Sequence, residues 1–336
     1  MIMNVSMWLK ALRVIPKVSK EEWEQLDVIS KWLIATRSAV FIMTFLSAAI
    51  GGILAFKAGK FDFWLWFLTT LGLIMAHATN NLINDYTDYI KGVDHDNYFR
   101  AQYGPQPLEH GLMTKKQLIM YIVITGLIAL AIGIYLVYLR GTLALILMAI
   151  GAFFVLFYTY PLKYIGLGEL AVLIVWGPLM VGGTYYVITG EWDWNVVIAG
   201  LPYALGVTAV LFGKHIDKYE EDKRKGIRTL PVILGEKNAR MVVLGMLVLQ
   251  YLSVIYLVLT GFFTPFMLIV LLALPVFVKV WKAYSNPRPD APPEGYPPEA
   301  WPLWYVALAF WHNRRFGTLY LLGLIIEALI QRYFIS

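Results

Sequence analysis

The sequence has no cysteine and few charged residues. Without cysteine, the chain cannot form disulfides, bind a metal through thiolates or use a cysteine nucleophile. Asp, Glu, Lys and Arg together make up 15% of the 336 residues, and hydrophobic residues make up 59%. Soluble proteins average about a quarter charged and about half apolar residues. The composition therefore excludes an ordinary soluble protein and predicts an integral membrane protein.

The long apolar runs do not alternate polar and apolar residues as the strands of a membrane barrel do, so each is interpreted as a helix. A span needs about 20 mostly apolar residues. Nine runs meet this need, at 33–56, 63–85, 118–139, 142–160, 168–189, 195–216, 238–260, 263–283 and 316–334. The expected fold class is all-α, a polytopic membrane protein with about nine transmembrane helices bundled around a central cavity.

The first residues lack the uninterrupted apolar core of a cleavable signal peptide. Basic residues and the acidic run EEWEQLD interrupt this part of the sequence. We therefore expect residues 1–32 to form an interfacial N-terminal segment and residues 33–336 to form a single transmembrane domain.

Basic residues are unevenly distributed between the expected loops. With a cytoplasmic N-terminus, the external loops and the C-terminal tail contain only Lys57, Lys60, Arg140 and Arg332, and the other 24 of the 28 basic residues lie on the inner side. We expect a multi-pass protein of the cell membrane whose acidic loops face the cytoplasm and whose C-terminus is external. The net charge of +6 follows from this bias, and we expect no nucleic-acid partner because no soluble basic domain exists.

Two acid-rich segments, residues 80–97 and 214–236, each follow directly on an apolar run. Carboxylates at the ends of membrane helices carry a large desolvation cost, so they need a partner or a function. Ordinary polar residues at the membrane surface are the alternative interpretation. The clustering of acids in two separate segments favours a functional site.

The first acidic segment places its oxygen-bearing side chains at helical spacing. Asn81, Asn84, Asp85 and Asp88 are three or four residues apart, so a continuous helix presents them on one stripe. Carboxylate and amide oxygens suit Mg²⁺, which is commonly held by one or two carboxylates together with a substrate phosphate. The segment is therefore a candidate magnesium site.

The second acidic segment mixes acids with basic residues. If the preceding helix continues, Asp217 and Glu221 share a face and Asp222 lies on another, so helical geometry favours Glu221 as the partner of Asp217. Arg228 follows Gly226, where a fixed turn would aim its guanidinium at a phosphate group. An exposed loop that obeys the positive-inside rule is the alternative, and it suits Lys223 and Lys225.

These residues carry a resemblance to a known family. The stretches NDYTDYIKGVD and DKYEEDKRKGIRTLPVILG resemble the two aspartate-rich motifs of the UbiA superfamily of intramembrane aromatic prenyltransferases. Arg37, the stretch YTYPLKYIGLGE and the stretch WGPLMVGGTYYVITG add to the similarity. The last stretch and the KGVD variant are most similar to the branch that prenylates 1,4-dihydroxy-2-naphthoate in menaquinone biosynthesis.

The first motif and the loop after it depart from the family pattern at two positions. Gly92 stands where the common form has a third carboxylate, and Asp94 is available instead. Gln106 replaces the usual arginine of the following loop, and Arg100 is the candidate to supply that charge.

The second motif departs at one position. Counted back from Gly226, the family register expects carboxylates at positions 218 and 222, and this chain has Lys218 and Asp222 there. Asp217 is interpreted as the displaced carboxylate. The family register thus favours Asp222 as the second ligand, whereas helical geometry favours Glu221.

The resemblance implies an enzyme that transfers a prenyl chain, with Mg²⁺ as cofactor and Mn²⁺ as a substitute. The expected catalytic residues are Asp88, Asp217 and Lys163. The expected metal ligands are Asn84, Asp85, Asp88, Asp94, Asp217, Glu221 and Asp222. Diphosphate binding is assigned to Arg37, Asn81, Arg100, Lys163, Lys214 and Arg228, and acceptor binding to His77, His110 and His215.

The expected partners are an isoprenyl diphosphate donor, an aromatic acceptor resembling 1,4-dihydroxy-2-naphthoate, and the lipid bilayer; no oligomeric state is predicted. The same fold with another acceptor remains an alternative: 4-hydroxybenzoate, homogentisate, a chlorophyllide-like ring or a glycerol-phosphate lipid. A transporter or lipid-binding protein is the alternative from another class, although transporters place charged groups near the bilayer midplane. For His77, a packed core histidine is the alternative to a substrate contact.

Overall fold

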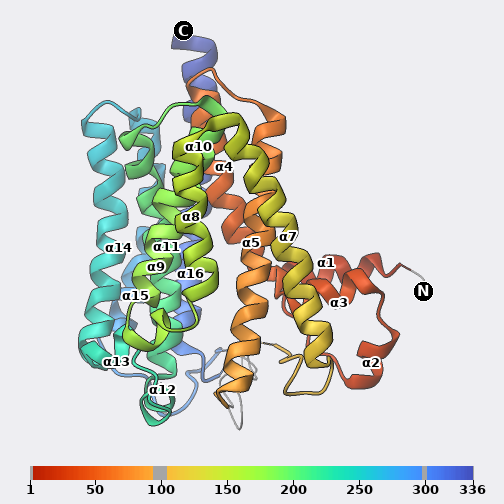
Figure 1. Cartoon of the computed structure of the whole chain (residues 1–336). Helices are drawn as coiled ribbons and strands as arrows, with labels where there is room; N and C mark the ends of the chain where they lie inside the picture. Colours follow the sequence, from red (N-terminus) through yellow and green to blue (C-terminus); the bar gives the residue numbers. More distant parts are fainter. Residues whose placement is uncertain (1–2, 94–103, 297–300, 336) are drawn as a thin grey trace. The chain divides into compact units, whose positions relative to one another are not determined.

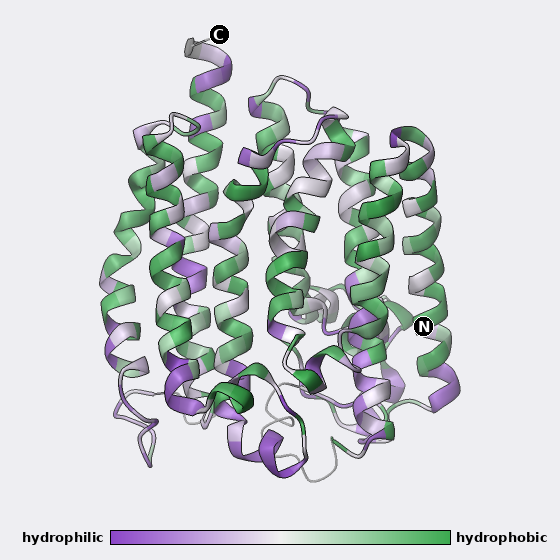
Figure 2. Cartoon of the chain, turned by 60° about the vertical axis from the view of Figure 1, so that its left-hand side comes forward, coloured by the Kyte–Doolittle hydropathy of each residue, from purple (hydrophilic) through white to green (hydrophobic). Residues whose placement is uncertain are grey.

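The computed structural model of the protein describes residues 3–93, 104–296 and 301–335. Across these three ranges the chain is helical and contains no β-strand (Figure 1). The helices are apolar along most of their length, and hydrophilic residues concentrate at helix ends and in connecting loops (Figure 2). The expected all-α, membrane-spanning fold class is confirmed.

Helical segments are present at all nine predicted positions within the described ranges. Six of them are long and apolar enough to cross a membrane: Ser38–Lys57, Lys115–Arg140, Gly168–Thr189, Trp194–Asp217, Glu236–Leu259 and Pro265–Tyr284. Of the other three, α8 has only 16 residues, whereas α5 and α16 are long but contain more polar residues. The exact count of nine spans stays a prediction.

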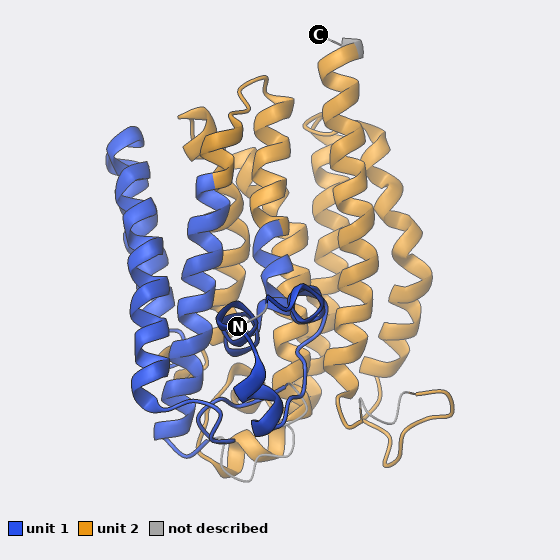
Figure 3. Cartoon of the chain, turned by 90° about the vertical axis from the view of Figure 1, so that its right-hand side faces the viewer, with its two compact units in different colours: residues 1–45, 68–160 blue, residues 46–67, 161–336 orange. Residues whose placement is uncertain are grey.

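The chain divides into two compact units (Figure 3). Unit 1 comprises residues 1–45 and 68–160, and unit 2 comprises residues 46–67 and 161–336. Helices α4 (Phe41–Lys57) and α5 (Phe63–Ile90) each contribute residues to both units. The expected division into an interfacial segment and a single transmembrane domain stays a prediction.

Unit 1 begins with short helices and continues with long ones. Besides its parts of α4 and α5, it contains α1 (Val5–Arg13), α2 (Lys20–Gln25), α3 (Val28–Ala35), η1 (Ser38–Val40), α7 (Lys115–Arg140) and α8 (Thr142–Phe157). A capping box between Thr114 and Gln117 starts α7, and Gly141, with a φ of 76°, separates α7 from α8. Only 11% of the most apolar stretch of α7 is buried inside the protein, as expected for a lipid-facing helix.

Asp27 ties α1 to α3 within unit 1. Its carboxylate accepts hydrogen bonds from the backbone amide and hydroxyl of Ser30, from the Trp8 indole and from the Asn4 amide. Desolvation raises the pKa of Asp27, but these hydrogen bonds outweigh it and hold the pKa well below its ordinary 3.8. Because the folded pKa is depressed, this stabilisation is present above pH 3.8 and is lost as the pH falls toward the folded value.

Unit 2 is organised around α11. Its elements after residue 160 are η2 (Leu162–Ile165), α9 (Gly168–Ile174), η3 (Val175–Gly182), α10 (Gly183–Thr189), α11 (Trp194–Asp217), α12 (Tyr219–Arg224), α13 (Leu230–Leu234), α14 (Glu236–Leu259), η4 (Pro265–Ala273), α15 (Leu274–Tyr284), α16 (Trp304–Ile330) and η6 (Gln331–Ile335). Helix α11 packs on α14, α16 and η3, and 78% of its most apolar stretch is buried inside the protein. The second acidic segment thus follows the most enclosed candidate span of the described chain.

An ion pair links α4 to α16 at the end of unit 2 that lies away from the second acidic segment. Lys57, the last residue of α4, lies 3.0 Å from Glu327 of α16, and Glu327 also accepts a hydrogen bond from the Thr264 amide. Both charged side chains are largely buried, so each needs the other to offset its desolvation. Glu327 therefore has a structural role at this end.

Candidate active site

The first acidic segment lies on one continuous helix in unit 1. Helix α5 runs through to Ile90, so Asn81, Asn84, Asp85 and Asp88 share a stripe, as predicted from their spacing. Asn84, Asp85 and Asp88 are each at most 9% exposed. The helix thus gathers two carboxylates and two amides in a largely enclosed environment.

Arg37 binds this stripe from the turn between α3 and η1. Its Nη2 atom lies 3.3 Å from an Asp85 carboxylate oxygen and donates to Asn84 Oδ1 at 3.2 Å and to the Asn81 carbonyl at 3.1 Å. The Arg37 backbone has a φ of 55°, which is unfavourable for a residue with a side chain. Functional sites often retain such strained residues, and here the strained turn directs the guanidinium onto α5.

Asn84 links the stripe to the segment that follows α8. Its Nδ2 atom donates to Asp88 Oδ2 at 3.3 Å and to Thr159 Oγ1 at 3.1 Å, and Thr159 is buried. The sequence analysis did not select Thr159, although it belongs to the stretch YTYPLKYIGLGE. A threonine between two tyrosines has no sequence feature that indicates a functional role. Only its contact with Asn84 in the structure identifies Thr159 as part of the candidate site.

The loop after α5 is described only in part. Asp94 and Arg100, predicted as a metal ligand and a diphosphate ligand, lie outside the described residues. Gln106 is 3% exposed, and within the described chain its side-chain nitrogen has no hydrogen-bond partner. His110 is exposed, and its ring nitrogen accepts a hydrogen bond from the Gln106 amide at 3.3 Å. Its acceptor-binding role stays a prediction.

The second acidic segment does not lie on a continuous helix. Helix α11 ends at Asp217, Lys218 has a non-helical backbone, and α12 begins at Tyr219. The helical extrapolation that paired Asp217 with Glu221 is therefore wrong, because it assumed an unbroken axis. The choice between Glu221 and Asp222 must rest on their surroundings.

Asp217 contacts the start of α16. One carboxylate oxygen accepts a hydrogen bond from the Tyr305 amide at 2.9 Å, and the other accepts one from the Val306 amide at 3.0 Å. The first amides of a helix have no partner within the helix, and a carboxylate there also interacts favourably with the helix dipole. Asp217 thus caps α16. The catalytic and metal-binding roles predicted for it stay predictions, because each oxygen retains a lone pair beyond its amide hydrogen bond.

Asp222 is the buried acid of α12. It is 1% exposed, and one of its oxygens lies 3.2 Å from the Lys218 ammonium. Glu221 is more accessible and pairs with Arg224 at 3.4 Å. Asp222 and Glu221 each retain one buried oxygen that has no hydrogen-bond partner within the described residues. Both acids therefore have accepting capacity for a ligand.

The predicted diphosphate ligands of unit 2 differ in exposure. Lys163 in η2 is 6% exposed, Lys214 on α11 is half-buried, and Arg228 is exposed. Gly226 adopts a φ of 70°, and the amide of Ile227 then bonds the carbonyl of Asp222 at 2.8 Å. This glycine ends α12 and fixes the turn that precedes Arg228, as expected from the sequence.

Two of the predicted acceptor-binding histidines are buried and have partners. His77 Nδ1 lies 2.8 Å from the Thr44 hydroxyl in unit 1, and His215 Nδ1 lies 2.6 Å from Glu169 Oε1 in unit 2. Glu169 is 1% exposed and was not selected from the sequence. A lone acid at the start of an apolar run could have identified it, because buried carboxylates are rarely without function. The acceptor-binding roles of both histidines stay predictions.

Each unit thus carries its own charged set. Unit 1 has the oxygen-rich stripe of α5 with Arg37, and unit 2 has Asp222 and Glu221 with several cations. Over the ranges that the structure describes, no three His, Asp or Glu side chains form a metal-binding group. The hard oxygens of Asn84, Asp85 and Asp88 nevertheless suit Mg²⁺, which needs only one or two protein carboxylates when phosphate oxygens complete its shell.

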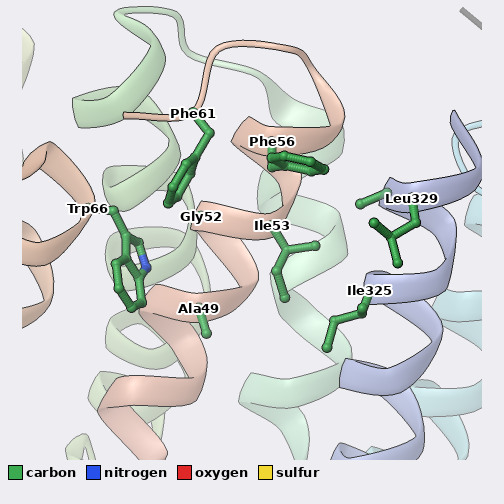
Figure 4. A pocket seen from close by; sticks show the side chains of 9 residues that line it. Ala49, Gly52, Ile53, Phe56, Phe61, Trp66, Ile325 and Leu329 are labelled. Atoms are coloured by element: carbon green, nitrogen blue, oxygen red, sulfur yellow. The ribbon is translucent and has the colours of Figure 1, made fainter. Parts of the chain in front are cut away.

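An apolar pocket of about 240 Å³ lies at the other end of unit 2 (Figure 4). Residues of α4, of the following loop, of the start of α5 and of α16 line it: Ala49, Gly52, Ile53, Phe56, Phe61, Trp66, Ile325, Ala328 and Leu329. Along α16, Ile325 is about 30 Å from Tyr305, where Asp217 binds, at about 1.5 Å per residue. The residues that line the pocket carry no titratable side chain, and the pocket lies far from the second acidic segment.

Comparisons with known proteins agree on one family. Residues 44–314 match the UbiA prenyltransferase family. The 1,4-dihydroxy-2-naphthoate octaprenyltransferase of Bacillus subtilis (strain 168) is 27% identical over 258 residues, which cover 74% of this chain and 80% of that protein. UbiA prenyltransferase domain-containing protein 1 of Gallus gallus is 30% identical over 259 residues, which cover 76% of each chain.

Solved structures have the same fold. A UbiA homolog from Aeropyrum pernix K1 aligns with a TM-score of 0.65 and 20% identity, over 86% of this chain and 98% of that one. A UbiA homolog from Archaeoglobus fulgidus bound to GPP and Mg²⁺ aligns with a TM-score of 0.55 and 17% identity, over 88% and 99%. With the family match over residues 44–314, these findings confirm the prediction from the two acidic motifs: the chain belongs to the UbiA prenyltransferase family.

Proposed function

We propose that this protein transfers a prenyl chain from an isoprenyl diphosphate to an aromatic acceptor within the membrane. The observation that carries the proposal is the stripe of Asn81, Asn84, Asp85 and Asp88 on α5, which Arg37 contacts at Asn81, Asn84 and Asp85. In a chain of this family, such an enclosed set of hard oxygens suits a divalent cation with a diphosphate.

The predicted ligands are given different roles in this proposal. Asn84, Asp85 and Asp88 would hold Mg²⁺, which would supply positive charge to offset the negative charge of the leaving diphosphate. Lys163 and Arg228 bind diphosphate oxygens through charge-assisted hydrogen bonds. The carbon–oxygen bond of the donor breaks and its electrons leave with the diphosphate. A carbon of the electron-rich ring then bonds to the allylic carbon. The ring becomes aromatic again when the attacked carbon loses its proton, or its carboxylate as CO₂, and the bonding electrons stay in the ring.

Arg37 and Thr159 are positioning residues in this scheme. Arg37 holds Asp85 and Asn84 in place, and Thr159 fixes the Asn84 amide that also contacts Asp88. Burial of this set excludes water, which protects an allylic cation from hydrolysis. In this scheme Arg37 acts on the diphosphate indirectly, because it orients the residues that would hold the metal.

We infer that the acceptor is a naphthalene-type ring such as 1,4-dihydroxy-2-naphthoate. The similarity to the Bacillus subtilis enzyme supports this choice, and the KGVD form of the first motif agrees with it. A test incubates the purified protein with radiolabelled geranylgeranyl diphosphate and a panel of acceptors, and product masses identify the accepted ring. Prenylation of 4-hydroxybenzoate in preference to the naphthoate would contradict the acceptor but retain the reaction class.

Replacing Asp88 with Ala tests the metal assignment. The substitution removes an oxygen from the stripe without shortening α5, so the protein should still insert, while turnover should fall by at least about a hundredfold. Removal of divalent metal with EDTA should abolish wild-type turnover, and Mg²⁺ or Mn²⁺ should restore it.

The matched control is Asp290→Ala, which removes an exposed acid from the loop before α16. It should leave turnover unchanged. Wild-type turnover in Asp88→Ala, or undiminished turnover after metal removal, would refute the proposed metal site.

A further inference from the structure

Lys218 occupies an unusual position in unit 2. It lies at the break between α11 and α12, and its ammonium is 3.2 Å from Asp222, with the two side chains 6% and 1% exposed. The α12 amide of Asp222 donates to the Lys218 carbonyl at 2.9 Å, so backbone and side chain connect the same two residues. The break in the helix therefore fixes a cation inside the second acidic segment.

The contacts of Asp217 and Lys218 do not support Asp217 as the displaced carboxylate of the second motif. Asp217 is directed to α16, and the side chain that lies beside Asp222 is Lys218, at the position where the family register has an acid. Two acids there would attract a divalent cation to balance their charge. Lys218 and Asp222 balance each other without a metal.

Lys218 retains binding capacity after this pairing. An ammonium group has three donors, and within the described residues its one charged partner is a single oxygen of Asp222. Burying a lysine is costly unless its charge and its donors are satisfied. A diphosphate brings several anionic oxygens that would satisfy the remaining donors, and lysine is a common phosphate ligand.

We propose that Lys218 binds the diphosphate of the donor directly and replaces a metal ion at the second acidic segment. The inference rests on the proposed function, because it assigns this residue to the same donor. Asp222 is then a positioning residue that holds the ammonium in place. The Mg²⁺ proposed for the first acidic segment is unaffected.

Binding of inorganic pyrophosphate in EDTA tests this inference without turnover. Calorimetry on the detergent-purified wild-type chain should detect metal-independent binding. Lys218→Met should weaken it roughly ten- to hundredfold, the effect of losing one charge-assisted hydrogen bond. Lys218→Arg should retain most of it. Lys218→Asp should abolish binding in EDTA and restore it when Mn²⁺ is added, with more Mn²⁺ bound per chain than in the wild type.

Lys223→Met is the matched control. Lys223 lies on the same short helix but is exposed, so its loss should change pyrophosphate binding less than twofold, a rough limit for an exposed charge. If Lys218→Met unfolds because Asp222 is left unpaired, the double variant Lys218→Met with Asp222→Asn removes both charges, and it too should lose metal-free binding.

Two results would overturn the inference. One is wild-type affinity for pyrophosphate in a folded Lys218→Met or double variant, and the other is a wild-type chain that binds pyrophosphate only with metal. Failure of the proposed function appears differently, as a wild-type chain that binds no geranylgeranyl diphosphate and prenylates no acceptor. The two outcomes are therefore distinguishable.

Discussion

The aspartates of the two acidic segments make different contacts, although the sequence predicts the same metal-binding role for them. Asp85 and Asp88 share the stripe of α5, whereas Asp217 uses both oxygens to cap α16 and Asp222 pairs with Lys218. A carboxylate with both oxygens bonded to backbone amides stabilises the start of a helix, and these bonds use two of its roughly four acceptor sites. Burial alone therefore does not identify the ligands, because all four are buried.

The variant Asp217→Asn distinguishes the helix cap formed by Asp217 from the metal-binding role that the sequence predicts for it. The amide has one acceptor oxygen and no charge, so it should lower the free energy of unfolding by about 1–2 kcal/mol, the usual scale for a lost helix cap. Thermal unfolding in detergent measures this loss, and Mn²⁺ binding followed by electron paramagnetic resonance should be unchanged. An unchanged melting temperature together with lost Mn²⁺ binding would show instead that Asp217 is a metal ligand. Asp290→Asn serves as the control.

Packing of α16 on α11 depends on glycine. A Cβ atom at Gly213 would lie 2.8 Å from the backbone carbonyl of Tyr305 and from the Tyr284 hydroxyl. Gly213 is one turn before Asp217, so the close approach that it permits also brings the start of α16 to the capping carboxylate. The two residues together determine how these helices meet.

Gly213→Ala should destabilise the protein, because the backbone of Tyr305 cannot move aside without disturbing the Asp217 cap. We expect a loss of about 1–3 kcal/mol, typical of overpacking, measured by thermal unfolding. Gly245→Ala on α14 is the matched control, since a Cβ there meets nothing within 4 Å. Its helix should tolerate alanine or gain stability. Equal melting temperatures for the two variants would contradict this account of the packing.

At the scale of the whole molecule, the distribution of basic residues predicts the orientation in the membrane. An odd number of spans places the two ends of the chain on opposite sides, and the 24 inner basic residues place the N-terminus in the cytoplasm. The structure supports an integral membrane protein, because six helices among the described residues are long and apolar enough to be candidate spans. The sides of the membrane remain a prediction.

Reporter fusions test this orientation. A reporter after Arg332 should lie outside the cytoplasm, and one inserted near Pro292, in the loop between α15 and α16, should lie inside. Protease protection in spheroplasts distinguishes the two sides. Both reporters in one compartment would mean that α16 does not cross the membrane and that the number of spans is not nine.

The sequence by itself determined the fold class, the family and the stripe of α5. These depend on composition, apolar runs and local helical spacing, which are properties of neighbouring residues. Only the tertiary structure decided where helix α11 ends, that Asp217 caps α16, and that Lys218 rather than a carboxylate lies beside Asp222. Residues far apart in the sequence form the cap, and their contact depends on how α11 and α16 pack, which no local pattern encodes.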